Sequence, residues 1–187
     1  ESKAFLATQI LDEARHLDVF RKRALMNGGG LMTQGGVGLR GFVADEDLVE
    51  LTAALHVSAE GSVLSLFRTR ALLAQNEAEK RIFRLCAQDE ARHVAFGILH
   101  VKRVLETQPW RRDEINHYID RGVRHFTAAQ TGITANPATA EAQAILLAGG
   151  DLNNIDKGYR KLMEIRRRQR EEFLHRCEVA GLPERKQ

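Results

Sequence analysis

Two identical five-residue words in the sequence contain the side chains from which metal sites are built. The word Asp-Glu-Ala-Arg-His occupies residues 12–16 and recurs letter for letter at residues 89–93. A Glu and a His three positions apart lie on one face of an α-helix, so both side chains can reach the same ion. A carboxylate together with an imidazole favours iron, manganese or zinc over calcium. The two words therefore predict a metal centre. Its expected ligands are Glu13, His16, Glu90 and His93.

The alternative is that both words lie on solvated helix faces and bind no metal. The number of copies decides between these two interpretations. A single Glu-x-x-His sequence is weak evidence, because both residues are common on exposed helices. Two identical copies within 187 residues favour a shared site. The neighbours of the second copy, such as Phe83 and Val94, also favour burial. Buried carboxylates and imidazoles are costly unless they are paired or bound to metal.

The elements that must position these words are predicted to be helices. Three prolines interrupt a sequence rich in the helix formers Ala, Leu, Glu, Arg and Gln. We expect an all-α protein of five or six helices, and 187 residues suffice for one domain but not for two. On the first helix the residues expected at helical spacing are Phe5, Gln9, Ala14, Leu17 and Phe20. The expected helices span residues 2–26, 45–74, 77–107, 109–129, 138–148 and 151–180, with a glycine-rich loop at 27–41 and a turn at 131–137.

Charge and composition argue against several classes of partner. The net charge is +3, from 28 basic and 25 acidic residues, and the pI is about 9.1. The one dense basic run, residues 166–170, is followed at once by two glutamates, which indicates a solvated helix face and no nucleic-acid partner. No segment has the length of a membrane span or the pattern of a signal peptide, so no membrane is expected. Cys86 and Cys177 form no CxxC pair, which favours a cytoplasmic location.

The repeated word resembles the ferritin-like dinuclear carboxylate proteins. In that superfamily two helices each contribute a Glu-x-x-His and two others each contribute one Glu, all pointing inward. The resemblance implies a ferritin-like four-helix bundle, here with extra C-terminal helices. It also implies a lone Glu on the helix between the two words, and Glu60 is the acidic residue of the apolar segment 54–64. Glu60 is therefore the expected fifth ligand. His56, one turn earlier, is expected beside the site or in the core.

The resemblance also implies a carboxylate on a helix that precedes the first word. Glu1 stands only twelve residues before Glu13, too close for a separate antiparallel helix. We therefore expect this ligand upstream of residue 1, so that the first bundle helix is missing and the domain 1–187 is incomplete at its N-terminus.

The form Asp-Glu-x-Arg-His is more similar to the ribonucleotide reductase small subunit, the related ligand-binding oxidases and the bacterial multicomponent monooxygenases than to ferritin. By that likeness Asp12 orients His93 and Asp89 orients His16. The two arginines of the words, Arg15 and Arg92, would pair with these aspartates.

Two departures limit the likeness. Phe20 stands where the reductase subunit usually has its radical tyrosine, and Leu55 stands where the ligand-binding oxidases have a cross-linked tyrosine. Neither a stored tyrosyl radical nor that cross-link is expected at these positions. Some members without the radical tyrosine use manganese with iron, so Phe20 does not exclude the class.

The expected cofactor is a pair of iron ions, or manganese with iron. The expected function is an oxidase or monooxygenase that activates O2 to oxidise a small organic substrate, supplied with electrons by a ferredoxin-type donor and assembled as a homodimer. The alternatives are an iron-handling ferroxidase or storage protein and a ribonucleotide reductase small subunit. The residues expected to border a cavity are Gln9, Phe20, His56, Leu64 and Gly97.

Two weaker signals remain. Residues 36–41 fit the dinucleotide pattern GxGxxG, but no strand precedes them, so a loop between helices, able to gate access to the site, is the favoured interpretation. His100 lies two turns after His93 and is expected in the core or beside the site. The remaining histidines, expected at the surface, are His117, His125 and His175.

Overall fold

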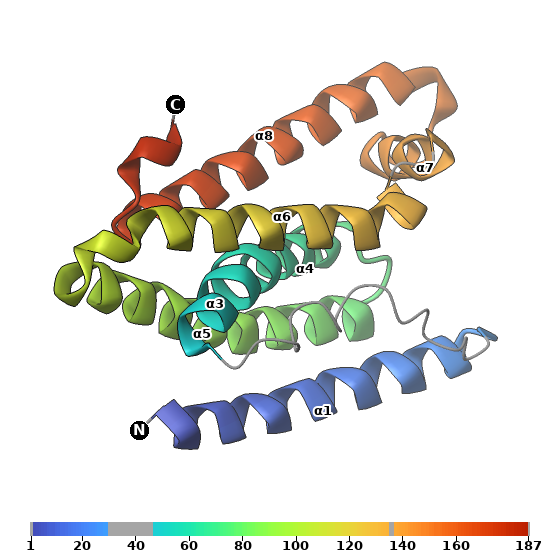
Figure 1. Cartoon of the computed structure of the whole chain (residues 1–187). Coiled ribbons are helices and arrows are strands. Elements are labelled where there is room, and N and C mark those ends of the chain that lie inside the picture. Colours follow the sequence, from blue (N-terminus) through green and yellow to red (C-terminus); the bar gives the residue numbers. More distant parts are fainter. Residues whose placement is uncertain (1, 30–46, 135–136, 187) are drawn as a thin grey trace.

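The computed structural model describes residues 2–29, 47–134 and 137–186, and this part of the chain contains helices and turns without strands. The prediction of an all-α protein is confirmed for these residues. Helix α1 (Ser2–Met26) runs antiparallel to α5 (Glu77–Thr107), because Asp12 faces His93 while His16 faces Asp89 (Figure 1). The two words thus lie across from each other on neighbouring helices.

A continuous rod of helix lies between α5 and α6 (Arg112–Thr134). It consists of α3 (Leu48–Leu51), the π-helix η1 (Thr52–Glu60) and α4 (Gly61–Leu73). Figure 1 shows α1 and α8 on opposite sides of this rod. A 3-10 turn, Pro109–Arg111, joins α5 to α6. The C-terminal part comprises α7 (Pro137–Leu147), α8 (Ile155–Val179) and the 3-10 turns Leu152–Asn154 and Pro183–Lys186.

Local capping explains where the helices begin and end. The Asp47 side chain accepts a hydrogen bond from the Val49 amide at 2.8 Å. Asn76 caps α5 in the same way, with 2.9 Å to the amide of Glu79. Such side chains satisfy amides that have no partner within the first helical turn. Gly149 and Gly150, with φ of 82° and 83°, follow the end of α7, a backbone conformation that glycine adopts most easily.

One boundary differs from the sequence prediction. Helix α6 continues to Thr134, so the turn expected at 131–137 is wrong for residues 131–134. A single glycine within a helix costs only about 1 kcal/mol, and Gly132 is therefore no reliable end signal. The GxGxxG segment 36–41 and most of the glycine-rich loop lie outside the described residues.

The main apolar core joins the rod, α5, α6 and the end of α8, and α1 contributes nothing to it. Fully buried members include Val57, Val101 and Ile119. Its buried residues are Val49, Ala53, Val57, Val101, Val104, Leu105, Ile115, Ile119, Cys177, Ala180 and Leu182.

Helix α1 is held in another way. Its buried residues are all polar: Gln9, Asp12 and His16. The helix predicted from the spacing of residues such as Ala14 and Leu17 is present, but both of these side chains are exposed, Leu17 to 71%. The inner face of α1 instead carries the site's polar side chains.

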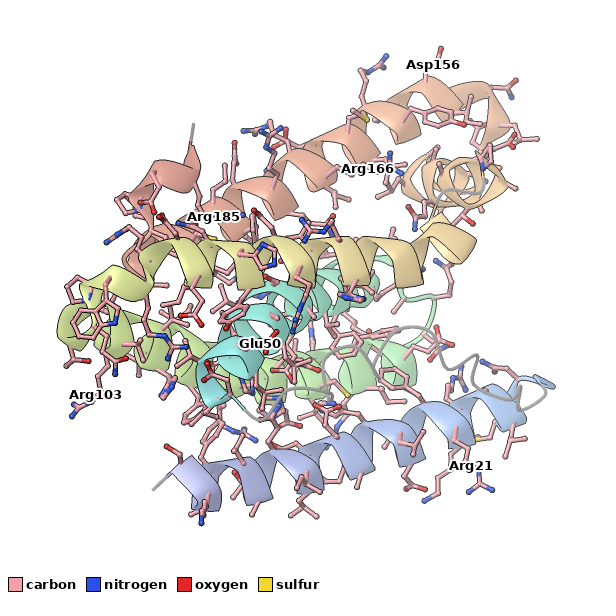
Figure 2. All side chains as sticks on the ribbon, viewed as in Figure 1. Arg21, Glu50, Arg103, Asp156, Arg166 and Arg185 are labelled. Carbon is pink, nitrogen blue, oxygen red and sulfur yellow. The ribbon has the colours of Figure 1, made fainter. Side chains whose placement is uncertain are left out.

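Outside the site, most charged side chains of the described residues are at least partly exposed to solvent. Figure 2 shows Arg21 and Arg103 pointing away from the helices, whereas Glu50 lies among them. Within the basic run 166–170, Arg167 pairs with Glu164 at 2.8 Å, as expected of a solvated helix face.

None of the helices in residues 2–29, 47–134 and 137–186 has both the length and the apolar character needed to cross a membrane.

Candidate metal centre

A cluster of carboxylates and imidazoles lies where α1, η1 and α5 meet. One ligand atom from each of Glu13, Glu60, Glu90 and His93 lies within 4.8 Å of all the others. Glu60, Glu90 and His93 are buried, whereas the Glu13 side chain is 49% exposed. The fold thus gathers residues from three helices into one group that could hold a metal ion.

Two carboxylates of this cluster each face both imidazoles. Glu13 places Oε2 3.5 Å from Nδ1 of His16 and Oε1 3.5 Å from Nδ1 of His93. Glu90 places Oε1 3.6 Å from Nδ1 of His16 and Oε2 3.7 Å from Nδ1 of His93. Glu60 belongs to the His93 side, with Oε2 3.9 Å from Nδ1. His16 is therefore part of the same site, although it lies at its far end.

The atoms that face one another have no other partners. His16 Nδ1, His93 Nδ1, Glu60 Oε2 and Glu90 Oε2 are buried and make no hydrogen bond. Buried polar atoms are nearly always paired, so an unpaired group of this kind calls for an explanation. Ligand atoms held about 2.0–2.2 Å from one ion stand roughly 3–4 Å apart. The observed separations fit metal coordination.

The electrostatics of the cluster favour a bound cation. Burial, followed by the charge of Glu90, raises the pKa of Glu60 to about 8. Burial also raises the pKa of Glu90. Burial opposes a charge on His16, yet its contacts with Cys86 and Glu13 prevail and raise its pKa to about 11. Without a metal, protons therefore supply positive charge that a divalent ion would replace.

A second set of contacts orients the two imidazoles. Asp12 Oδ2 lies 3.0 Å from Nε2 of His93, and Asp89 Oδ2 lies 3.2 Å from Nε2 of His16. A neutral imidazole that donates through Nε2 keeps the lone pair of Nδ1 available. Each aspartate therefore turns Nδ1 of the opposite helix's histidine toward the cluster.

The arginines of the two words complete this arrangement. Arg92 donates to Asp12 Oδ2 at 2.9 Å and to Asp89 Oδ1 at 2.8 Å. Arg15 donates to Asp12 and, at 3.1 Å, to Asp89 Oδ2. Burial raises the pKa of Asp12, but hydrogen bonds from His93, Arg15 and Arg92 outweigh it and hold that pKa below its usual value. Both arginine side chains are 55% exposed and close the site on the solvent side.

Glu60 reaches the site from a π-helix, which the sequence did not reveal. The π-helical segment η1 ends at Glu60 itself, and π-helical turns occur often at functional sites. Two glycines let neighbouring helices approach it. A Cβ at Gly97 would collide with His56, and a Cβ at Gly122 would collide with the carbonyl oxygen of Ala54.

Of the residues expected to border a cavity, Gln9, His56 and Gly97 lie near His93, and Phe20 lies near His16. At the His93 end, Gln9 Nε2 donates to Glu60 Oε1 at 2.7 Å, and His56 Nε2 lies 2.9 Å from Gln9 Oε1. Gly97 contacts His56. The link from Gln9 to Glu60 had no signal in the sequence beyond the position of Gln9 one turn before Glu13.

Aromatic rings flank both ends of the site. Near His16, the ring of Phe20 lies 5.5 Å from that of Phe67 and 5.6 Å from that of Phe83. Near His93, Phe5 stacks on Phe96 at 4.3 Å. The ring of His100 stacks on that of Phe96 at 6.1 Å, and Leu64 is buried on α4.

The three histidines expected at the surface lie on α6 and α8, outside the three elements that form the site. His117 and His175 are exposed, and His125 is half-buried.

Comparisons of the chain with protein-family models, with curated proteins and with solved structures find no match. The geometry of the site therefore carries the functional argument.

Proposed function

We propose that the protein is an oxidoreductase with a dinuclear iron centre, or a manganese–iron centre, that activates O2 to oxidise a small organic substrate. One observation carries the proposal. Glu13 and Glu90 each direct one oxygen toward Nδ1 of His16 and the other toward Nδ1 of His93. Carboxylates placed in this way suit two ions side by side, each with its own imidazole.

The residues of the chain have distinct tasks in this proposal. Glu13, His16, Glu60, Glu90 and His93 would hold two metal ions, which in the reduced state would provide two electrons for the reduction of O2. Asp12 and Asp89 hold the proton on Nε2 of each histidine, which keeps Nδ1 free to bind. The rings of Phe5 and Phe67 lie edge-on to His93 and His16 at 6.3 Å and 6.2 Å, where they exclude water from the buried side.

The two ion positions are unequally provided with ligands. Glu60 serves the His93 side alone, and Glu13 remains half exposed. We propose that the His16 side therefore has fewer protein ligands than the His93 side. In a metal titration of the present chain, the His16 side should bind more weakly, and His16→Ala should abolish the weaker step.

The proposed partners follow from the chemistry. Reduction of O2 to two waters takes four electrons, and a two-electron oxidation of the substrate supplies two of them. The other two need a donor, and we propose a ferredoxin-type protein as their source. We further propose a homodimer. Size-exclusion chromatography separates this from the storage alternative, because an iron-storing protein assembles as a large shell.

Metal analysis with anomalous scattering tests the central proposal. After anaerobic loading with Fe(II) and Mn(II), we expect two ions per chain, one beside Nδ1 of His16 and one beside Nδ1 of His93. Reduced protein should then consume O2. Glu90→Gln should lower the metal content, whereas Glu106→Gln, exposed on the same helix, should not. A single ion, or two ions without O2 uptake, would contradict the proposed function.

A further inference from the structure

We propose that Gln9 and His56 act together as positioning residues that make Glu60 a one-oxygen ligand of the ion on the His93 side. The inference rests on the proposed dinuclear centre and deepens it. It assigns a role to two buried polar residues that neither bind metal in the proposed ligand set nor belong to the repeated words.

The two oxygens of Glu60 have different surroundings. Oε1 accepts a hydrogen bond of 2.7 Å from Nε2 of Gln9. Oε2 is buried without a hydrogen-bond partner and lies 3.9 Å from Nδ1 of His93 and 3.8 Å from Nε2 of His56. Gln9 itself is only 7% exposed, so water does not compete freely for its amide. A hydrogen bond to a buried carboxylate is among the stronger kinds, and it leaves Oε2 alone to face the ion.

The carboxylate of Glu60 can only accept, so it selects the NH2 end of the Gln9 amide, and the carbonyl end then faces His56. The carbonyl oxygen of Gln9 lies 2.9 Å from Nε2 of His56. Because that oxygen can only accept, Nε2 of His56 must donate. A flipped amide would set its oxygen against the carboxylate of Glu60 and its NH2 group against the N–H of His56. Both contacts would be repulsive, so the chain His56–Gln9–Glu60 has one favourable orientation.

The surroundings of His56 keep its ring neutral and in place. The ring is fully buried, and burial lowers its pKa to about 4, with the charge of His93 adding to the effect. Phe96 meets the ring edge-on at 5.6 Å. The close approach of Gly97 leaves no room for His56 to shift toward α5.

The arrangement has a consequence for coordination. The bond from Gln9 uses one lone pair of Oε1 and holds the orientation of the carboxylate. For Glu60 to bind through both oxygens, or to span two ions, its carboxylate would have to rotate against this bond. Removal of the Gln9 amide should therefore change the environment of one ion and leave the other unchanged. Loss of a hydrogen-bonding partner behind a metal ligand typically weakens metal binding by about 10–100-fold.

Mössbauer spectroscopy of the chain loaded anaerobically with iron-57 as Fe(II) measures the two ions separately. The unmodified protein should show two ferrous quadrupole doublets. Gln9→Leu should shift only the doublet that His93→Ala removes, and it should weaken the binding of that ion by about 10–100-fold. The matched control is Thr8→Leu, which makes the same new residue at an exposed neighbouring position of α1. It should leave both doublets unchanged.

A double-mutant cycle tests whether His56 acts through Gln9. His56→Phe should shift the same doublet in the same direction, and the double variant should resemble Gln9→Leu alone. Additive shifts would show that His56 acts independently and would overturn its part of the proposal. If Gln9→Leu does not fold, Gln9→Asn withdraws the amide by one methylene and is measured instead, with the same expected shift.

The two possible failures can be told apart. If the unmodified chain binds no pair of iron ions, the proposed function fails. If it shows two doublets and Gln9→Leu leaves both in place with unchanged affinity, the dinuclear centre stands and the positioning role of Gln9 is wrong.

Discussion

At the scale of single residues, the repeated word works because each copy supports the other. The Asp of one helix holds the His of the other, and both arginines bond to both aspartates. A buried carboxylate next to an imidazole would otherwise be costly. The two aspartates and the two arginines of the words pair with each other. These contacts can therefore form before any metal binds.

Removal of one aspartate should therefore affect one ion. Asp89→Ala takes away the acceptor for Nε2 of His16, and the imidazole loses both its orientation and its tautomer preference. We expect metal binding on the His16 side to weaken about 10–100-fold, measured by titration with Mn(II). Asp18→Ala serves as the control, because Asp18 is exposed and pairs with Lys22 at the surface of α1. Unchanged loading in Asp89→Ala would contradict the orienting role.

A second residue-scale prediction concerns acid stability away from the site. Hydrogen bonds from Arg111 and Tyr118 lower the pKa of Glu114 to about 2. A lowered pKa in the folded state stabilises the protein above the unfolded value, and this stabilisation disappears as the pH falls through the folded value. Glu114→Gln should therefore be less stable than the unmodified chain at pH 7. The difference should shrink between pH of about 4.5 and about 2.

Urea titrations at several pH values measure this difference. Glu106→Gln, exposed on α5, should behave like the unmodified protein throughout. A difference for Glu114→Gln that persists unchanged at pH 2 would contradict the assignment.

At the scale of elements, the position of Glu60 depends on how closely the rod packs between α5 and α6. Gly97 and Gly122 permit this approach from opposite sides. The main-chain spacing is therefore part of the site, although neither glycine touches a ligand of the proposed centre.

Gly97→Ala should separate the rod from α5, since its new Cβ would collide with His56. We expect loss of stability, typically about 1–3 kcal/mol for overpacking, together with weaker metal binding on the His93 side. Gly158→Ala is the matched control, because its Cβ would collide with the Ala144 backbone between α7 and α8. It should lower stability and leave metal affinity unchanged. Thermal unfolding and metal titration of both variants decide between a local and a general effect.

At the scale of the whole molecule, two kinds of cohesion hold the helices together. The rod, α5, α6 and the end of α8 share an apolar core. Helix α1 docks on them through the buried polar residues of the site and through rings such as Phe5 and Phe20. Without a cation, Glu60 and Glu90 can be charged together at that interface only at an electrostatic cost, because burial raises the pKa of both groups. The attachment of α1 should therefore depend on metal.

Hydrogen–deuterium exchange measures this dependence. In a chelator, amides of α1 should exchange faster than in the protein loaded with Mn(II), by up to about 100-fold when free metal exceeds its Kd 100-fold. Amides of α6 near Ile115 and Ile119, which lie in the apolar core, should change little. Equal protection of α1 in both conditions would show that metal does not contribute to its docking.

The sequence by itself determined those features that depend on residues close to one another along the chain. The spacing of Glu13 and His16 puts both on one face of a helix whatever else the molecule does. The start of α5 is local in the same way, because the side chain of Asn76 accepts a hydrogen bond from the amide of Glu79. The gathering of Glu60 with the two words was expected only through a resemblance.

The tertiary structure alone decided what depends on how helices rotate and approach. It turned Leu17 outward, converted the segment before Glu60 into a π-helix and linked Gln9 to Glu60. The physical reason is one of range. Helical periodicity relates residues three or four positions apart. Contacts between helices depend on packing over the entire fold, which a short segment of the sequence does not specify.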